Sequence, residues 1–113
     1  MKRTFKAFIA YQNKNGNFKS KIIIKSLIDL PDGDLLIKVK YSSLNYKDAL
    51  SASGSKGITK HYPHTPGIDA AGVIVRSNDR NFRINDRVIV TGFDLGMNTS
   101  GGFAEYILSL IHI

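Results

Sequence analysis

Few side chains in this sequence of 113 residues are of the types that most often bind metals or carry out catalysis. There is no cysteine, which excludes disulfides and every thiolate metal site. His61 and His64 are three residues apart, but Pro63 lies between them, and His112 stands near the carboxyl end. No acidic or thiolate partner is near these histidines, and no Ser, His and Asp pattern indicates a catalytic triad. The sequence therefore predicts no metal site.

A phosphate-binding loop is not found either. A dinucleotide-binding fold needs a Gly-x-Gly-x-x-Gly pattern that follows a strand and opens a helix. The stretch Gly54-Ser55-Lys56-Gly57 has a different spacing, and no amphipathic helix follows it. A pyrophosphate site is therefore not expected within this sequence.

The polar segment around Asn45, Tyr46 and Asp48 has two interpretations. In the first it is a capped helix start, with Asn45 as the cap, Tyr46 in the core and Asp48 near the positive end of the helix. Ser42 or Ser43 could also be the cap. In the second interpretation the same residues form a binding site. The residues alone do not decide between the two.

Short extended segments separated by turns must position these residues. Leu35–Tyr41 alternates, with Leu35, Ile37, Val39 and Tyr41 on one side, which predicts a strand with one buried face. A short helix is expected over Tyr46–Ser53, ended by Gly54. Glycine, asparagine and proline favour turns at 13–17, 31–34 and 85–86. The other predicted strands are 5–12, 18–26, 68–76, 87–91 and 103–107.

Composition indicates one globular domain, and the short extended segments separated by turns indicate that it is mainly β. Hydrophobic residues make up 42% of the chain, and the apolar runs, such as Ile22–Ile24, are far shorter than the roughly 20 residues of a membrane span. With no signal peptide visible, a cytoplasmic protein without membrane contact is expected. The net charge of +7 is scattered, which favours a solvated surface over attraction for phosphate-bearing ligands or nucleic acid.

Four segments in order carry a family resemblance. Together they resemble the GroES-like catalytic domain of the medium-chain dehydrogenase/reductase superfamily, and the first is similar to the branch with acrylyl-CoA reductases and related quinone oxidoreductases. The resemblance covers about residues 5–107 and implies a partly open barrel with one short helix. The segments are Ser42-Ser43-Leu44-Asn45-Tyr46-Lys47-Asp48, Pro66-Gly67-Ile68-Asp69-Ala70-Ala71-Gly72, Asn85-Asp86-Arg87-Val88 and Gly101-Gly102-Phe103-Ala104-Glu105-Tyr106.

The resemblance also implies chemistry without zinc. Zinc members of the superfamily place a Cys ligand where this chain has Asn45 and a His ligand where it has Ile68. An isoleucine cannot coordinate a metal, and an asparagine offers only a weak neutral oxygen. The implied activity is NADPH-dependent hydride transfer to an activated C=C bond, as in acrylyl-CoA, or to a quinone. The choice between these substrates, and between NADP and NAD, stays open.

Roles for single residues follow from the same resemblance. Tyr46, Asn45 and Asp48 are the expected cofactor-binding residues. Tyr46 is expected to touch the cofactor, and the Asn45 amide to hydrogen-bond the cofactor or the substrate. Asp69 is expected to orient neighbouring side chains or act on the substrate, so Asn45 and Asp69 are the catalytic candidates. Close backbone packing is expected at the small residues Gly67, Ala70, Ala71, Gly72, Gly101 and Gly102.

The expected organisation is residues 1–107 as the GroES-like domain and residues 108–113 as a truncation scar or an incomplete strand. The parent protein would add a Rossmann domain and form a homodimer, and the fragment alone would be inactive. Two alternatives remain: a standalone GroES-like module for interaction or oligomerisation, and a small nucleic-acid or phosphate binder.

Overall fold

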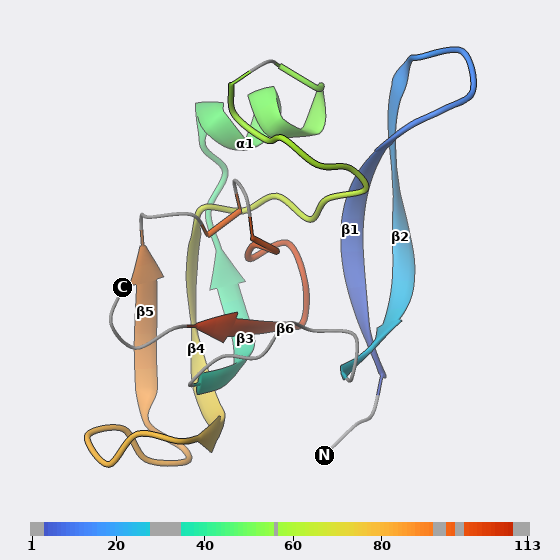
Figure 1. Ribbon diagram of the computed structural model, residues 1–113. Helices are drawn as coiled ribbons and strands as arrows, with labels where there is room; N and C mark the ends of the chain where they lie inside the picture. The colour runs from blue at the N-terminus through green and yellow to red at the C-terminus, as the bar shows by residue number, and fades with distance from the viewer. Residues whose placement is uncertain (1–3, 28–34, 56, 92–94, 97–98, 110–113) are drawn as a thin grey trace.

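The computed structural model describes residues 4–27, 35–55, 57–91, 95–96 and 99–109. Within these ranges β1 and β2 form a two-stranded sheet, and four further strands form a second sheet in the order β5-β4-β3-β6 (Figure 1). No helix in these ranges is long and apolar enough to cross a membrane. The prediction of a mainly β, open fold with one short helix is confirmed. The elements are β1 (Thr4–Gln12), β2 (Phe18–Ser26), β3 (Leu35–Ser42), α1 (Tyr46–Ala52), β4 (Asp69–Ser77), β5 (Arg87–Thr91) and β6 (Tyr106–Ser109).

The β1–β2 hairpin is closed by the asparagine-rich turn that the sequence predicts. The Asn13 side-chain oxygen accepts hydrogen bonds from the backbone N–H groups of Asn15, at 3.0 Å, and Asn17, at 2.9 Å. Gly16 supplies a positive φ of 83°. The predicted turn at 31–34 lies outside the described residues.

The core has two hydrophobic clusters, one on each side of β3. Leu35 and Ile37 belong to the first and Leu36 to the second, so the prediction of a single buried face for this strand is wrong. The second cluster forms because β1 brings Phe5 and Ala7 against the face that carries Leu36. Tyr41, expected on the buried face, is 77% exposed, because the register between β3 and β4 shifts between Val39 and Tyr41. The buried members are Leu35, Ile37, Ala70, Ile74, Leu95 and Ile107 in the first cluster and Phe5, Ala7, Leu36 and Tyr106 in the second.

The last strand begins three residues later than predicted, because residues 103–105 share their backbone hydrogen bonds among β1, Pro66 and Val39 and do not pair regularly with one strand. The Phe8 N–H donates to the Phe103 carbonyl at 2.8 Å, and the Glu105 N–H donates to the Lys6 carbonyl at 3.0 Å. The chain then pairs with β3 from Tyr106 to Ser109, which ties the two sheets together. Residues 108 and 109 belong to β6, and residues 110–113 lie outside the described residues. The assignment of 108–113 to a scar or an incomplete strand therefore stays a prediction.

Close backbone packing at the predicted glycines is confirmed. A Cβ atom on Gly72 would lie 2.1 Å from the Lys38 carbonyl oxygen of the neighbouring strand. Gly67 has a φ of +115°, and a Cβ there would lie 2.5 Å from the Gly102 nitrogen. A Cβ atom on Gly101 or Gly102 would in turn lie within 3 Å of carbonyl oxygens of residues 66–69. These glycines therefore set how closely the residues before β4 approach the residues before β6.

His64 joins the first sheet to the rest of the molecule. Its backbone exchanges two hydrogen bonds with Ala10 of β1, at 2.8 and 2.9 Å. Its ring is buried, and Nε2 lies 2.7 Å from the Gly96 carbonyl oxygen. Burial lowers the pKa of His64, and nearby Lys25 lowers it further, while the hydrogen bond to Gly96 opposes the change.

This histidine predicts a loss of stability in mild acid. Because the folded-state pKa lies below the usual 6.5, the unfolded chain takes up the proton first, so stability falls as the pH drops from about 6.5 through the folded-state value. Urea denaturation at pH 7.5, 6.5 and 5.5 measures the effect. His64→Gln is expected to flatten the pH dependence over this range, whereas the matched variant of exposed His61, His61→Gln, is expected to keep it. Equal slopes in both variants would contradict the assignment.

Candidate functional site

Helix α1 starts as a capped helix. Asn45 has extended backbone angles, φ −127° and ψ 159°, and its N–H donates to the Asp48 Oδ2 atom at 2.9 Å. Asn45 therefore occupies the predicted N-cap position, and the side-chain bond at this helix start comes from the Asp48 carboxylate, while the Asn45 Nδ2 group bonds to Ser43 and Asp69. The burial of Tyr46 that the first interpretation predicted is wrong, since its side chain is 79% exposed.

Asp48 also holds the start of β4. Its side chain is only 2% exposed, and Oδ1 accepts hydrogen bonds from the backbone N–H groups of Gly67, at 3.2 Å, and Ile68, at 3.0 Å. A buried carboxylate with three backbone donors is well satisfied. Asp48 thus fixes the helix start against the segment that leads into β4.

Asp69 comes from the first position of β4 and meets the same helix start. Its Oδ2 atom accepts hydrogen bonds from the Ser43 hydroxyl and from the Asn45 Nδ2 group, both at 3.1 Å. The Nδ2 group also lies 3.0 Å from Ser43 Oγ and 3.5 Å from Asp48 Oδ2. We call Ser43, Asn45, Asp48 and Asp69 the polar network. In it the Asn45 amide is held between two carboxylates.

The structure thus brings together three of the four predicted site residues and adds one. Ser43 was expected only as a possible helix cap, and its bonds to both Asn45 and Asp69 were missed. The signal available in the sequence was a hydroxyl two residues before the asparagine. The network has no group placed to act as an activated nucleophile, and its evident effect is to fix the orientation of an amide.

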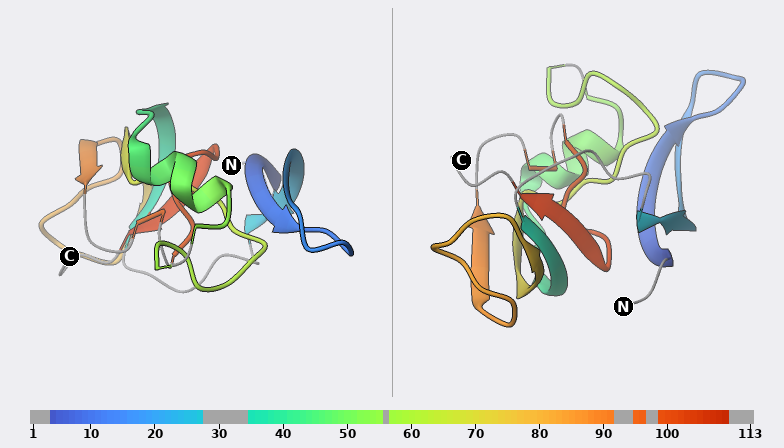
Figure 2. Two further views of the ribbon diagram at one scale, coloured as in Figure 1. Left: turned by 90° about the horizontal axis from the view of Figure 1, so that it is seen from above. Right: turned by 60° about the horizontal axis from the view of Figure 1, so that its bottom comes forward.

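An exposed apolar surface adjoins the polar network. Leu44 is 86% exposed and Tyr46 is 79% exposed, one on each side of Asn45 in the chain. Figure 2 shows α1 from above, where it lies across the top of the molecule. An exposed aromatic ring next to an oriented amide suits a flat ligand with hydrogen-bonding groups.

Asn45 and Ile68, which stand where zinc members of the superfamily carry their ligands, both contact Asp48 in the polar network. The N–H groups of Asn45 and Ile68 both donate to Asp48. Among the described residues no group of three or more His, Cys, Asp or Glu side chains could hold a metal ion. His61 is exposed on the loop before β4, and the side chain of His64 is used in the contact with Gly96.

The fold and this site define a GroES-like domain of the kind found in two-domain dehydrogenases and reductases. The chain belongs to the alcohol dehydrogenase GroES-like domain family, whose model matches residues 31–110. The resemblance to the medium-chain dehydrogenase/reductase superfamily is thereby confirmed.

Curated relatives belong to the branch that the sequence indicated. Over 78 residues the chain is 49% identical to YhfP of Bacillus subtilis, provisionally named a quinone oxidoreductase, covering 69% of this chain and 24% of that protein. It is 37% identical over 92 residues to the acrylyl-CoA reductase AcuI of Ruegeria pomeroyi, covering 81% of this chain and 28% of the relative. The chain therefore spans about a quarter of the length of these relatives.

Solved structures of oxidoreductases are also similar to this chain over nearly its whole length. The yhdH oxidoreductase of Salmonella enterica in complex with NADP has a TM-score of 0.89 and 38% identity, over 94% of this chain and 32% of that one. The Bacillus subtilis yhfP structure with NAD bound has a TM-score of 0.89 and 40% identity, over 97% of this chain and 33% of that one.

Proposed function

We propose that this chain is the GroES-like domain of a longer, NADPH-dependent oxidoreductase that reduces an activated C=C bond, as in acrylyl-CoA, or a quinone, without zinc. The observation that carries the proposal is the Asn45 amide, oriented by Asp69 and Ser43 beside the exposed Tyr46 ring. The names of the relatives support the substrate classes.

The described residues fit a nicotinamide cofactor at one wall of its site. Tyr46 offers exposed aromatic surface for a flat ring, and Asn45 lies next to it with a fixed amide. Asp48 fits direct contact poorly, because it is buried and both its oxygens accept bonds from the protein. We therefore assign Tyr46 and Asn45 to ligand contact and Asp48 to positioning.

In the proposed reaction the cofactor supplies a hydride when bound. With an enoyl thioester the hydride goes to the β-carbon and a proton from solvent or an acid goes to the α-carbon, so the C=C bond becomes a single bond. The residues of this chain orient the reactants. Asp69 acts through Asn45, because its Oδ2 atom holds the amide nitrogen and thereby fixes which way the amide faces.

We propose a reaction without zinc because of the residues at positions 45 and 68, where zinc members of the superfamily carry their ligands. Ile68 has an aliphatic side chain, and the Asn45 amide nitrogen already lies within hydrogen-bond distance of Asp69 and Ser43. Neither is a good ligand for a divalent transition metal.

NADPH oxidation by the full-length protein tests the proposal. We expect turnover with acrylyl-CoA or with 1,4-benzoquinone, unchanged by a chelator. Tyr46→Ala is expected to raise the KM for NADPH about tenfold, because an aromatic contact is worth about 1.4 kcal/mol. Its melting temperature should stay the same, since the ring is exposed.

The control is Ile84→Ala, which removes an exposed apolar side chain on the β4–β5 turn and is expected to leave the KM unchanged. Absence of NADPH oxidation with both acceptors would refute the proposed activity. Turnover with an unchanged KM in Tyr46→Ala would refute only the role of Tyr46.

A further inference from the structure

The register of β3, β4 and β5 arranges side chains in rows on one face of the sheet. Residues directly opposite each other in antiparallel strands point to the same side, and so do residues two apart along a strand. Asp69 is opposite Thr91, and this row adjoins the polar network. The next two rows on this face are Tyr41–Ala71–Ile89 and Lys38–Val73–Arg87. Beyond them, Leu36 lies on the same side of β3 and is covered by β1, so we use the name outer face only for these three rows.

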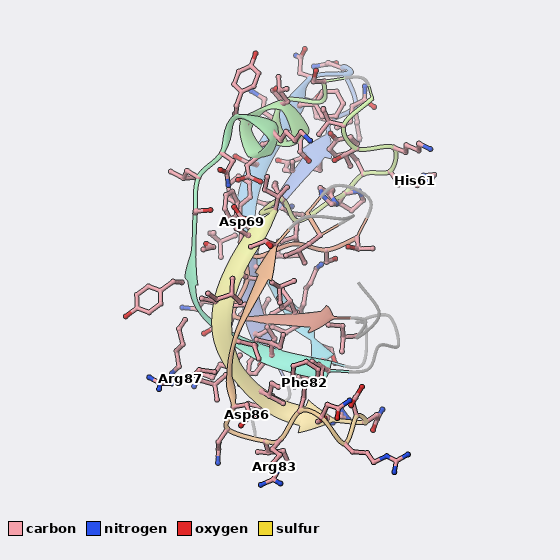
Figure 3. The ribbon with its side chains drawn as sticks, turned by 90° about the vertical axis from the view of Figure 1, so that its left-hand side faces the viewer. His61, Asp69, Phe82, Arg83, Asp86 and Arg87 are labelled. Atoms are coloured by element: carbon pink, nitrogen blue, oxygen red, sulfur yellow. The ribbon has the colours of Figure 1, made fainter. Side chains whose placement is uncertain are left out.

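The rows differ sharply in chemistry. Tyr41 and Ile89 are each 77% exposed and give an apolar row. Lys38 and Arg87 are exposed and give a cationic row with Val73 between them. From the polar network outward the face is thus acidic, then apolar, then basic. Figure 3 shows Asp69 in the upper part of the sheet and Arg87 below it, with Arg83 farther down at the β4–β5 turn.

We propose that the outer face binds the CoA portion of a CoA thioester. The phosphates lie against Lys38 and Arg87, and the pantetheine arm crosses Tyr41 and Ile89 toward the polar network. This inference rests on the proposed function and selects one of its two substrate classes. A quinone has no anionic tail that would use the cationic row.

The spacing suits such a ligand. Asp69 and Val73 are four residues apart on β4, which separates the acidic and cationic rows by about 13 Å. The pantetheine arm, with its two amides, has a reach comparable to about four residues of extended chain. One ligand can therefore place its thioester at the network and its phosphates at the cationic row.

Charge fixes the direction of the ligand. Asp69 stands at one end of the face, with the buried Asp48 behind it in the polar network, and their negative charge disfavours phosphate there. Lys38 and Arg87 attract phosphate at the other end. The exposed hydrophobic side chains of the middle row match the aliphatic parts of the arm. A phosphate-bearing thioester thus has one favourable orientation.

Calorimetric binding of CoA to the full-length protein tests the inference. In the double variant Lys38→Ala/Arg87→Ala the Kd for CoA is expected to rise about tenfold, because two charge contacts to phosphate are lost. The KM for acrylyl-CoA should rise equally, while those for 1,4-benzoquinone and NADPH stay unchanged. Weak binding of pantetheine, which lacks the phosphates, should be the same in wild type and variant.

The matched control is Lys14→Ala/Arg83→Ala, which removes the same two charges from exposed positions on two turns. The inference is overturned if the wild type binds no CoA, if both double variants weaken CoA binding equally, or if only the KM for NADPH changes. Because CoA binding is measured without turnover, it decides the inference even if NADPH oxidation fails and the proposed activity is wrong.

Discussion

Asp48→Ala is expected to lower the free energy of unfolding by about 3–5 kcal/mol, because it removes a buried acceptor from three backbone N–H groups. The donors of Gly67 and Ile68 would be left without their partner at a place where water has little access. The helix would also lose the acidic side chain of its first turn. Urea denaturation of the wild-type and variant chains measures the change.

Two further variants separate the causes. Asp86→Ala removes an exposed carboxylate that accepts one backbone hydrogen bond, from Arg83 at 2.8 Å, and is expected to cost about 1 kcal/mol or less. Asp48→Asn keeps one oxygen that accepts from Gly67 and Ile68. Its NH2 group then faces the Asn45 N–H, so two donors meet there and an intermediate loss of stability is expected. If Asp48→Ala cost no more than Asp86→Ala, the carboxylate would not be holding β4 to α1.

The same bonds explain why a structural residue matters for the proposed activity. Asp48 sets the position of the helix start, and Asp69 and Ser43 set the orientation of the Asn45 amide. These contacts come from two segments about twenty residues apart in the sequence. Any shift between α1 and the start of β4 would therefore misplace Asn45 relative to Tyr46, which is the surface we assign to the cofactor.

Local signals in the sequence were sufficient for part of this structure. The asparagine-rich hairpin turn, the capped start of α1 and β5 are all determined by neighbouring residues, and their bounds agree closely with the prediction. The ordered motifs also identified the family, since the match covers residues 31–110.

Contacts between distant segments account for the rest. Leu36 is buried because β1 packs on its side of the sheet, and alternation within β3 cannot reveal that. Residues 103–105 read as a strand, but they bond to β1, to Pro66 and, through the Glu105 carbonyl, to Val39. Regular pairing with β3 begins only at Tyr106. The link between Ser43 and Asp69 spans 26 positions, so no local pattern marks it.

Gly67→Ala should have an effect of similar size through sterics alone. The φ of +115° is costly for any side chain, and the new Cβ would lie 2.5 Å from the Gly102 nitrogen and 2.7 Å from the Phe103 nitrogen. Both neighbours are backbone atoms, so relief requires the segment before β6 to move away. We expect a loss of about 3–5 kcal/mol, measured by urea denaturation.

Gly57→Ala is the matched control, because Gly57 has a φ of +87° but nothing within 4 Å of its added Cβ. It isolates the conformational cost of a positive φ, about 1–2 kcal/mol. The difference between the two variants measures the close approach itself. Moving the segment would also strain two hydrogen bonds, from Gly102 to the Gly67 carbonyl at 2.9 Å and from Phe103 to the Pro66 carbonyl at 3.0 Å. Equal losses in the two variants would mean that this segment yields easily, and that Asp48 alone fixes the residues leading into β4.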